Sequence, residues 1–410
     1  MSCAVTECPQ ACQRRMHRKP ALKKMAVFES PADLESGSFE GRAEPVPSLT
    51  SQVRRFERPA SRVSTTFSGL LAGWLATGCG STCGAAHRAS PAPVPQPLAA
   101  VVAHAEASDI VTFKGMCDAS GAVPLGATRF AVADDEDNVL RVYDAALGGA
   151  PLSAVDISAA LDLPSKRTPE ADIEAATSIG DRALWLTSHG LSSSGQEQPS
   201  RLRFFATTAP LVGARLEPVG RPYHALLADM IADPALARFG LADAAKRAPK
   251  QPGGLNIEGM TRCRDGATVL IGFRNPVPQG KALLVPLLNP LQVSDGAHAQ
   301  FGAALLLDLD GLAVRSLSLW RDRYLIMAGA VAHERTSRLF VWDGANTPVA
   351  VTGLRLDELN PEAFVARDDN DRILLLSDDG DVEIDGRACK KLDDTTRKQF
   401  RGLWVRLTGY

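Results

Sequence analysis

Charged side chains recur at the start of an apolar strand in five similar stretches of the sequence. They are Asp118, Glu174, Glu258, Arg315 and Glu362. If these strands surround one axis, the five side chains converge although they lie far apart along the chain. Carboxylate oxygens around an opening could hold Ca²⁺, or a divalent metal that activates water for hydrolysis. Glu174 and Glu258, with Asn256, are the strongest candidates, but a carboxylate here can also simply accept backbone N–H groups and fix the strand.

A second set of polar residues follows the next strand in these stretches. The set comprises Asp134, Asp135, His189, Arg274 and Asp378. If they share one surface, His189 could act as a general base beside the anion-binding Arg274, which would suit a phosphoester or a carboxylate substrate. The acidic members also fit ordinary β-turns, in which their side chains cap the backbone. Turn chemistry does not demand a histidine or an arginine, so these two are the candidate catalytic residues.

One stretch contains both kinds of position. In NIEGMTRCRDGATVLIGFRNPVPQGKALLVPLLN, three apolar runs read as consecutive strands, and FRNPVPQG reads as a turn at the rim. Glu258 starts the first strand and Arg274 ends the second. The two side chains lie at the same end only if the strands are antiparallel and equal in length, so we expect them not to meet.

The elements that must position these residues are short strands bounded by Asp, Gly and Asn. A unit of strand, polar turn and strand recurs five times between residues 109 and 410, and four short strands per unit are typical of a β-propeller blade. The sequence therefore predicts an all-β propeller of about five blades. A sixth blade would form if residues 203–220 and a helical insertion near 223–248 conceal one.

Several segments resemble a known bacterial family, DUF3616, a group of proteins of unknown function. They include GMCDASGAVPL, RFAVADDEDNVLRVYD, ADIEAATSIGDRALWLTSHG and LNIEGMTRCRDGATVLIGFRNP, and the resemblance covers about residues 110–407. No activity comes with this family. The short IEG…RDG pattern is also similar to secreted propellers of the phytase-like and esterase-like kinds. Gluconolactonase-type propellers carry a metal-binding Glu in a similar place.

The N-terminal part of the chain has a different composition. Residues 1–52 are predicted to be disordered or to precede the true start, and residues 80–108 form a Pro/Ala-rich linker. Between them, at 53–79, four arginines precede an uncharged run that ends in LATGC, the layout of a secretory leader. LATGC resembles a lipoprotein signal with Cys79 as the lipidated residue, although Ala76 stands where Leu is usual. A short buried or membrane-associated helix is the alternative.

Composition excludes some classes of function. With 45 Lys+Arg against 47 Asp+Glu, the net charge of −2 offers no basic field for nucleic acid. The cysteines after residue 90 stand singly, which argues against a disulfide framework and a zinc site. We expect an envelope protein, periplasmic or anchored to the outer membrane only through Cys79, that binds a small molecule or a protein partner. The alternatives are a metal-dependent hydrolase of phytase-like, esterase-like or lactonase-like type and, if the leader is not used, a cytoplasmic protein.

Overall fold

The computed structural model describes residues 103–164, 169–210, 215–332 and 336–409. The chain divides into two units, Met1–Ser90 and Pro91–Tyr410, and every described residue belongs to the second. The predicted disordered start, the leader with Cys79 and the linker up to residue 102 therefore lie outside the described residues.

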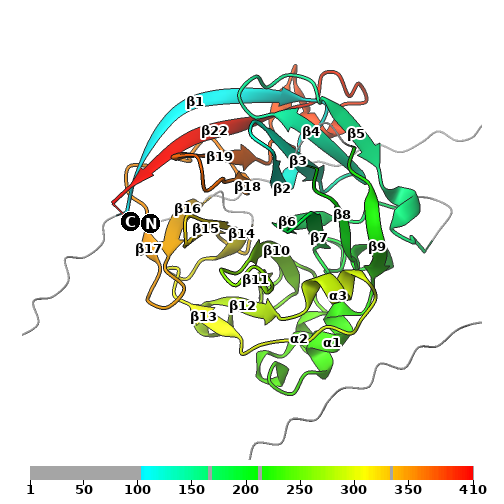
Figure 1. The fold of residues 1–410 in the computed structure, drawn as a ribbon. Helices are drawn as coiled ribbons and strands as arrows, with labels where there is room; N and C mark the ends of the chain where they lie inside the picture. Colours follow the sequence, from blue (N-terminus) through cyan, green and yellow to red (C-terminus); the bar gives the residue numbers. More distant parts are fainter. Residues whose placement is uncertain (1–102, 165–168, 211–214, 333–335, 410) are drawn as a thin grey trace, which may run out of the picture. The chain divides into compact units, whose positions relative to one another are not determined.

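Five four-stranded antiparallel sheets form a ring around a central axis (Figure 1). This confirms the predicted β-propeller, with five blades. Blade 1 contains β2 (Ala119–Leu125), β3 (Arg129–Asp134), β4 (Val139–Asp144) and β5 (Ser153–Asp156). Blade 2 contains β6 (Ile173–Ile179), β7 (Arg182–Thr187), β8 (Phe204–Thr208) and β9 (Pro218–Tyr223). Blade 3 contains β10 (Asn256–Arg262), β11 (Val269–Asn275), β12 (Ala282–Leu287) and β13 (Leu305–Leu307). Blade 4 contains β14 (Ala313–Trp320), β15 (Arg323–Gly329), β16 (Ser337–Trp342) and β17 (Val349–Ala350).

The fifth blade joins the two ends of the described chain. From the axis outward it contains β18 (Pro361–Val365), β19 (Arg372–Ser377), β22 (Gln399–Thr408) and β1 (His104–Lys114). In Figure 1, β1 and β22 run side by side along the outside of the ring, and their register pairs His104 with Thr408. The predicted linker boundary at residue 108 is therefore wrong. Residues 104–108 are strand because pairing with β22 satisfies their backbone groups even though most of their side chains are exposed.

Apolar side chains fill the spaces between neighbouring blades. Trp185 packs between blades 1 and 2, Trp320 between blades 4 and 5, and Phe113, Phe130, Tyr143 and Phe400 interlock blade 5 with blade 1. A side chain at Gly259 would approach Val314 of the next blade to within 2.6 Å. Small residues at such positions allow the inner strands to lie close together, which a ring of only five blades requires.

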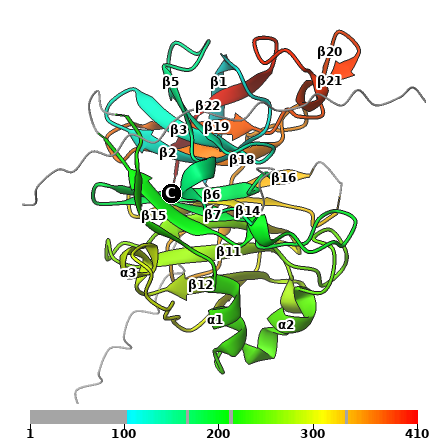
Figure 2. The ribbon, with the colours of Figure 1, turned by 90° about the vertical axis from the view of Figure 1, so that its right-hand side faces the viewer.

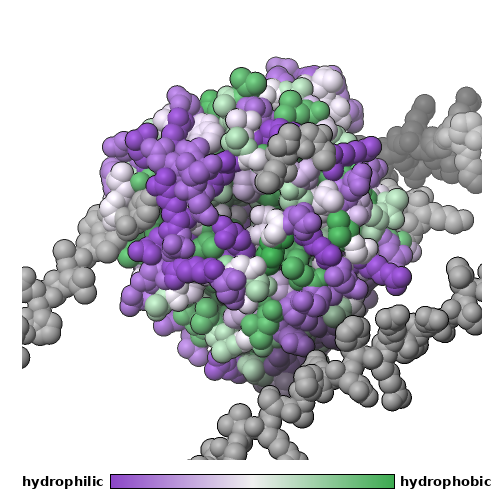
Figure 3. Space-filling model, viewed as in Figure 1, coloured by the Kyte–Doolittle hydropathy of each residue, from purple (hydrophilic) through white to green (hydrophobic). Residues whose placement is uncertain are grey.

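Three short helices and one extra hairpin lie outside the blades. The helices α1 (Leu226–Ala232) and α2 (Leu241–Ala244) form the predicted insertion before blade 3, and α3 (Pro290–Ser294) follows β12. The hairpin of β20 (Glu383–Ile384) and β21 (Arg387–Ala388) projects between β19 and β22 (Figure 2). In the part of the chain that the structure describes, no helix is long and apolar enough to span a membrane. Figure 3 shows hydrophilic residues over most of one face, with smaller apolar patches between them.

A disulfide ties the start of blade 1 to the segment after the β20–β21 hairpin. Cys117 and Cys389 are both fully buried, and their Cα atoms lie 5.9 Å apart although 272 positions separate them along the chain. The sequence analysis missed this pair. The two cysteines stand alone in the sequence, and only the closure of the ring brings blades 5 and 1 together.

Candidate functional site

Each innermost strand begins with a β-bulge. The register of the inner strand against its neighbour shifts at Glu174, between Ile257 and Gly259, at Arg315 and at Glu362. A bulge adds an unpaired residue and re-aims its side chain, often next to binding sites. The bulged residues are thus the charged ones, and they face one end of the ring.

Blade 1 departs from this pattern. Its register shift falls between Ala119 and Ala122, so Ser120 is the counterpart of Glu174, and the predicted equivalence of Asp118 with the other strand starts is wrong. Ser120 donates through Oγ to the carbonyl of Ile173 and so ties blade 1 to blade 2. Asp118 belongs instead to a second set of equivalent positions, two residues before the bulge, and the other members are Asp172, Asn256, Ala313 and Asn360.

Except for Ala313, these positions line a cavity of about 330 Å³ at one end of the central axis, which we call the charged mouth. The predicted residues that line it are Asp118, Asp135, Glu174, Asn256, Glu258, Arg274, Arg315, Glu362 and Asp378. The remaining charged or amide side chains around it are Glu136, Asp172, Arg201, Lys250, Asn360, Asp381 and Lys390. The whole first predicted set and three members of the second, Asp135, Arg274 and Asp378, therefore meet in one place.

The cavity wall formed by blades 3, 4 and 5 holds four charges that neutralise one another. We call Glu258, Arg274, Arg315 and Glu362 the arginine–glutamate cluster. Arg274 Nη1 lies 2.6 Å from Glu258 Oε1, Arg315 Nε lies 3.0 Å from Glu258 Oε2, and Arg315 also pairs with Glu362. All four side chains are buried, and such charges persist in an interior only when they are paired and hydrogen-bonded.

The pairing of Glu258 with Arg274 contradicts the expectation that they do not meet. Strands β10 and β11 each contain seven residues and run antiparallel, and Asn256 lies opposite Asn275. The start of one strand is therefore level with the end of the other. The condition that the sequence analysis set for an encounter is fulfilled.

Amide side chains complete this wall. Asn256 donates through Nδ2 to Glu258 Oε1 at 2.7 Å, and Asn360 donates through Nδ2 to Glu362 Oε1 at 2.9 Å. The same Asn-x-Glu arrangement thus occurs on blades 3 and 5. On blade 2 the corresponding residues are Asp172 and Glu174, so a second carboxylate takes the place of the amide donor.

The opposite wall, from blades 1 and 2, holds carboxylates with little compensation, and Asp134 adds one more behind this wall. We call Asp118, Asp134, Asp135, Asp172 and Glu174 the carboxylate cluster. One side-chain oxygen from each of Asp118, Asp134 and Asp135 lies within 4.8 Å of the other two. The same holds for one oxygen from each of Asp135, Asp172 and Glu174. Side-chain oxygens of acidic residues are the ligands of hard divalent cations, so this cluster could bind a metal.

Burial and mutual repulsion shift the pKa values of these carboxyl groups upward. Burial, then the charge of Asp378, raises the pKa of Asp118 to about 10. Burial and Asp137 raise the pKa of Asp134 to about 7. The pKa values of Asp135 and Glu174 are raised as well. Burial is the main cause, and the next is the charge of Glu174 for Asp135 and the charge of Glu258 for Glu174. Burial raises the pKa of Asp172 to about 6 although Arg201 opposes the shift.

The residues around Asp118 fix its carboxylate tightly. A side chain on Gly380 would lie 1.6 Å from Asp118 Oδ1, so only glycine fits against it. The neighbouring Asp378 accepts hydrogen bonds from Asn360 Nδ2 and from the Gly380 amide. On the other side, Lys390 pairs with Asp381 at 3.0 Å. The disulfide residues Cys117 and Cys389 directly precede Asp118 and Lys390.

Two predicted residues lie behind the mouth rather than on its lining. Asp134 is buried and accepts a hydrogen bond from the Glu136 amide. His189 is 3% exposed, its Nδ1 donates to the Thr187 carbonyl, and burial lowers its pKa to about 4. His189 also has φ 56°, a left-handed conformation. The structure thus separates His189 from the Asp135, Arg274 and Asp378 surface that it was expected to share.

The sequence analysis missed Asp172, Arg201, Asn360 and Lys390. A signal existed for two of them, because a polar residue precedes the strand-start glutamate by two positions in DIE, NIE and NPE. Arg201 pairs with Asp172 at 2.9 Å and with Glu170, but it comes from a loop between β7 and β8 that carries no repeated pattern. Lys390 reaches the site only through the folding of the β20–β21 segment.

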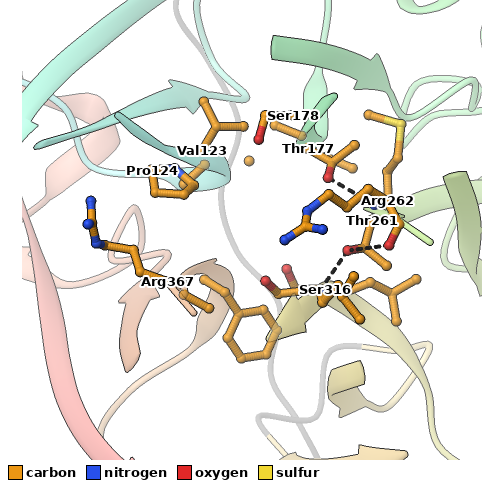
Figure 4. A pocket seen from close by; sticks show the side chains of 18 of the residues that line it. Val123, Pro124, Thr177, Ser178, Thr261, Arg262, Ser316 and Arg367 are labelled. Atoms are coloured by element: carbon orange, nitrogen blue, oxygen red, sulfur yellow. Dashed lines mark hydrogen bonds between the residues drawn. The ribbon is translucent and has the colours of Figure 1, made fainter. Parts of the chain in front are cut away.

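The other end of the axis carries a different cavity, of about 410 Å³ (Figure 4). Hydroxyl groups and small residues line it, with Arg262 and Arg367 on opposite sides. Thr177 Oγ1 accepts a hydrogen bond from the Arg262 amide, and Thr261 Oγ1 accepts one from Leu319, so these hydroxyls join neighbouring blades. Arg262 and Arg367 pair with Asp368 and Asp369. The polar groups of this end are largely used by the fold.

Comparison with known proteins supports the family resemblance. Residues 206–369 match the model of the family described as "Protein of unknown function (DUF3616)". The predicted resemblance to DUF3616 is confirmed over these residues. The DUF3616 match covers parts of blades 2, 3, 4 and 5, including Asn256, Glu258, Arg274, Arg315 and Glu362. No curated protein matches the chain.

Solved structures with a related arrangement are distant in sequence. The glutaminyl cyclase of Myxococcus xanthus is 12% identical, with a TM-score of 0.41 over 75% of this chain and 99% of that one. The PQQ-bound aldose sugar dehydrogenase of Streptomyces coelicolor is 10% identical, with a TM-score of 0.39 over 75% and 99%. A luciferin-regenerating enzyme is 10% identical, with a TM-score of 0.34 over 71% and 78%.

Proposed function

We propose that this protein binds a divalent cation at the charged mouth and, through that cation, a small ligand with an anionic group. Ca²⁺ is the favoured ion, because carboxylate and amide oxygens are its usual ligands and nitrogen or sulfur donors are not needed. The arginine–glutamate cluster lies across the same cavity and would face the anionic part of the ligand.

One observation carries this proposal. Asp135 Oδ1 is buried without a hydrogen-bond partner among the described residues, although Asp135 stands amid other carboxylates whose pKa values are raised. An unpaired buried acceptor costs free energy, and more so when it is charged. Either these groups hold protons or a cation compensates them. A cation would satisfy Asp135 and its neighbours at once.

The experiment is a calcium titration of the purified protein by isothermal calorimetry, after chelation, with Asp135→Asn alongside. We expect saturable binding by the wild type and at least a tenfold weaker affinity in the variant. Glu136→Gln is the matched control, because Glu136 also lines the mouth but lies outside the carboxylate cluster. A folded wild-type protein that binds no Ca²⁺, Mg²⁺ or Mn²⁺ would refute the proposal.

Binding without chemistry is the simpler form of this proposal, and metal-dependent hydrolysis is its alternative. The mouth offers acidic residues that could activate a metal-bound water, whereas His189, the predicted base, lies outside its lining. Phosphatase, esterase and lactonase substrates should be tested with the Ca²⁺-loaded protein. Turnover that Asp135→Asn abolishes would replace binding by hydrolysis.

We further propose that the protein works in the cell envelope. The buried disulfide between Cys117 and Cys389 supports this, because disulfides persist mainly in oxidising compartments. The basic and uncharged pattern before Cys79 agrees with export. Mass spectrometry of the mature protein from cells tests both points: we expect a lipid-modified N-terminus at Cys79. A chain that begins at Met1 in the soluble cytoplasmic fraction would contradict them.

A further inference from the structure

The carboxylate cluster consists of two groups that share one residue. Asp118, Asp134 and Asp135 form the first, and Asp135, Asp172 and Glu174 form the second. Within each group the three oxygens lie within 4.8 Å of one another. Because Ca²⁺–oxygen distances are about 2.3–2.6 Å, an ion among three such oxygens can contact all of them. Each group therefore has ligands for one ion, and Asp135 is common to both.

We propose that the carboxylate cluster binds two divalent cations and that Asp135 bridges them. This inference rests on the cation site proposed above and extends it. Asp118 and Asp134 complete the first site. Asp172 and Glu174 complete the second, with Asn256 as a further oxygen ligand.

When the carboxyl groups of the cluster are ionised, two divalent cations balance their charge better than one. Among the five carboxylates, only Asp172 forms an ion pair with a basic side chain in the part of the chain that the structure describes, at 2.9 Å from Arg201. One divalent cation would compensate two of the remaining four negative charges and leave two buried and close together. A second ion compensates these as well, and in a low-dielectric site uncompensated charges are strongly destabilising.

Asn256 supplies independent support for the second site. Its side chain is 5% exposed and lines the charged mouth. The hydrogen bond from Nδ2 to Glu258 fixes the amide, and Oδ1 is left buried with no hydrogen-bond partner among the described residues. The strand that carries Asn256, β10, packs beside β6, which carries Glu174. An amide oxygen held in this way is free to act as a ligand, and Ca²⁺ accepts such oxygens.

Native mass spectrometry with added Ca²⁺, together with calorimetric stoichiometry, tests the proposal on the full chain. We expect two ions per wild-type protein. Asp134→Asn should weaken only the first site and Glu174→Gln only the second, so each variant retains one tight ion and loses at least tenfold in affinity for the other. Asp135→Asn should weaken both sites, whereas the control Glu136→Gln retains two ions.

The outcomes separate this inference from the proposed function. Binding of a single ion by the wild type would overturn the two-cation site and leave cation binding intact. No ion on a folded wild type would overturn both. Loss of both ions in Asp134→Asn and in Glu174→Gln alike would show one shared site and would also overturn the inference. The wild-type stoichiometry needs no variant, so a misfolded substitution does not remove the test.

Discussion

The two walls of the charged mouth carry glutamates at the same backbone positions, but one wall pairs its glutamate with arginines and the other surrounds it with carboxylates. Glu174 and Glu258 occupy corresponding bulges on neighbouring blades, and both are buried. Glu258 has Arg274, Arg315 and the amide of Asn256 around it. Around Glu174, the charges of Glu258 and Asp172 raise its pKa. The carboxylates of Asp172 and Asp135 also belong to the same group of oxygens as that of Glu174. The repeated fold therefore fixes where a carboxylate stands, and a few neighbours decide whether a positive charge is paired with it.

Replacing Glu258 by Gln should disrupt the arginine–glutamate cluster and give the largest loss in the free energy of unfolding. The change removes the partner of two buried arginines, and breaking a buried ion pair costs about 3–5 kcal/mol. Urea denaturation measures the loss. The matched control is Glu174→Gln, which we expect to leave the free energy of unfolding within about 1 kcal/mol of wild type, or to raise it, because it removes a repelled charge. Equal losses in the two variants would refute the contrast.

Removing the disulfide should destabilise the segment next to Asp118, at the edge of the carboxylate cluster. In Cys117→Ser/Cys389→Ser the long closed loop is opened, and we expect a loss of about 3 kcal/mol in the free energy of unfolding. The change also frees the segments that carry Asp118 and Lys390 to the charged mouth, so Ca²⁺ affinity should fall. Cys263→Ser is the control, since Cys263 is a free cysteine. Unchanged stability of the double variant would show that the bridge contributes nothing.

Asn256→Asp should give Glu258 the same acidic neighbour that Glu174 has on blade 2. The variant replaces the amide donor of Glu258 by a carboxylate, as on blade 2, and we expect a cost of about 2 kcal/mol from the lost hydrogen bond and the added charge. Thermal and urea unfolding without metal measure it. Added Ca²⁺ should recover more stability in this variant than in wild type. A variant as stable as wild type without metal would argue that Asn256 is not what satisfies Glu258.

The smallest expected effect concerns His189 of blade 2, because burial lowers the pKa of this base whereas it raises the pKa of the acids Asp172 and Glu174 on the same blade. Its pKa of about 4 lies below the ordinary value of 6.5, so the unfolded chain binds a proton that the folded protein excludes. Stability should therefore fall as the pH decreases below 6.5, by about 1 kcal/mol at pH 5.5. His189→Asn, which tolerates the left-handed backbone, should lack this contribution when the two proteins are compared from pH 7.5 to 5.5. Parallel curves would contradict it.

Much of the fold was predictable from the recurrence of one unit. Bounding turns and apolar runs located the inner strands, and their charged starts indicated a shared mouth. The helical insertion was predictable from its composition. The N-terminal strand β1 was not, because its side chains alternate weakly and its pairing partner lies almost 300 residues away.

The sequence predicted many of the residues of the site, but not which of them contact one another. Strand starts identified Glu174, Glu258, Arg315 and Glu362, yet the bulges that displace Asp118 relative to them leave no sequence signature. Whether Arg274 meets Glu258 depends on strand length and register. His189 and Arg201 depend on loop paths, which local patterns do not specify.

The closure of blade 5 by β1 makes the ring dependent on a strand that lies far along the chain, β22. Strand β1 is synthesised before the strands of the other blades, but its partner β22 spans Gln399–Thr408, so the ring closes only after β22 has been made. Contacts so distant in sequence form late and slowly. Asp118 of blade 1 and Asp378 of blade 5 form an antiparallel β-bridge where the first and the fifth blade adjoin. A chain truncated before β22 would thus retain most of its strands, but blade 5 would lack the strand that joins β19 to β1.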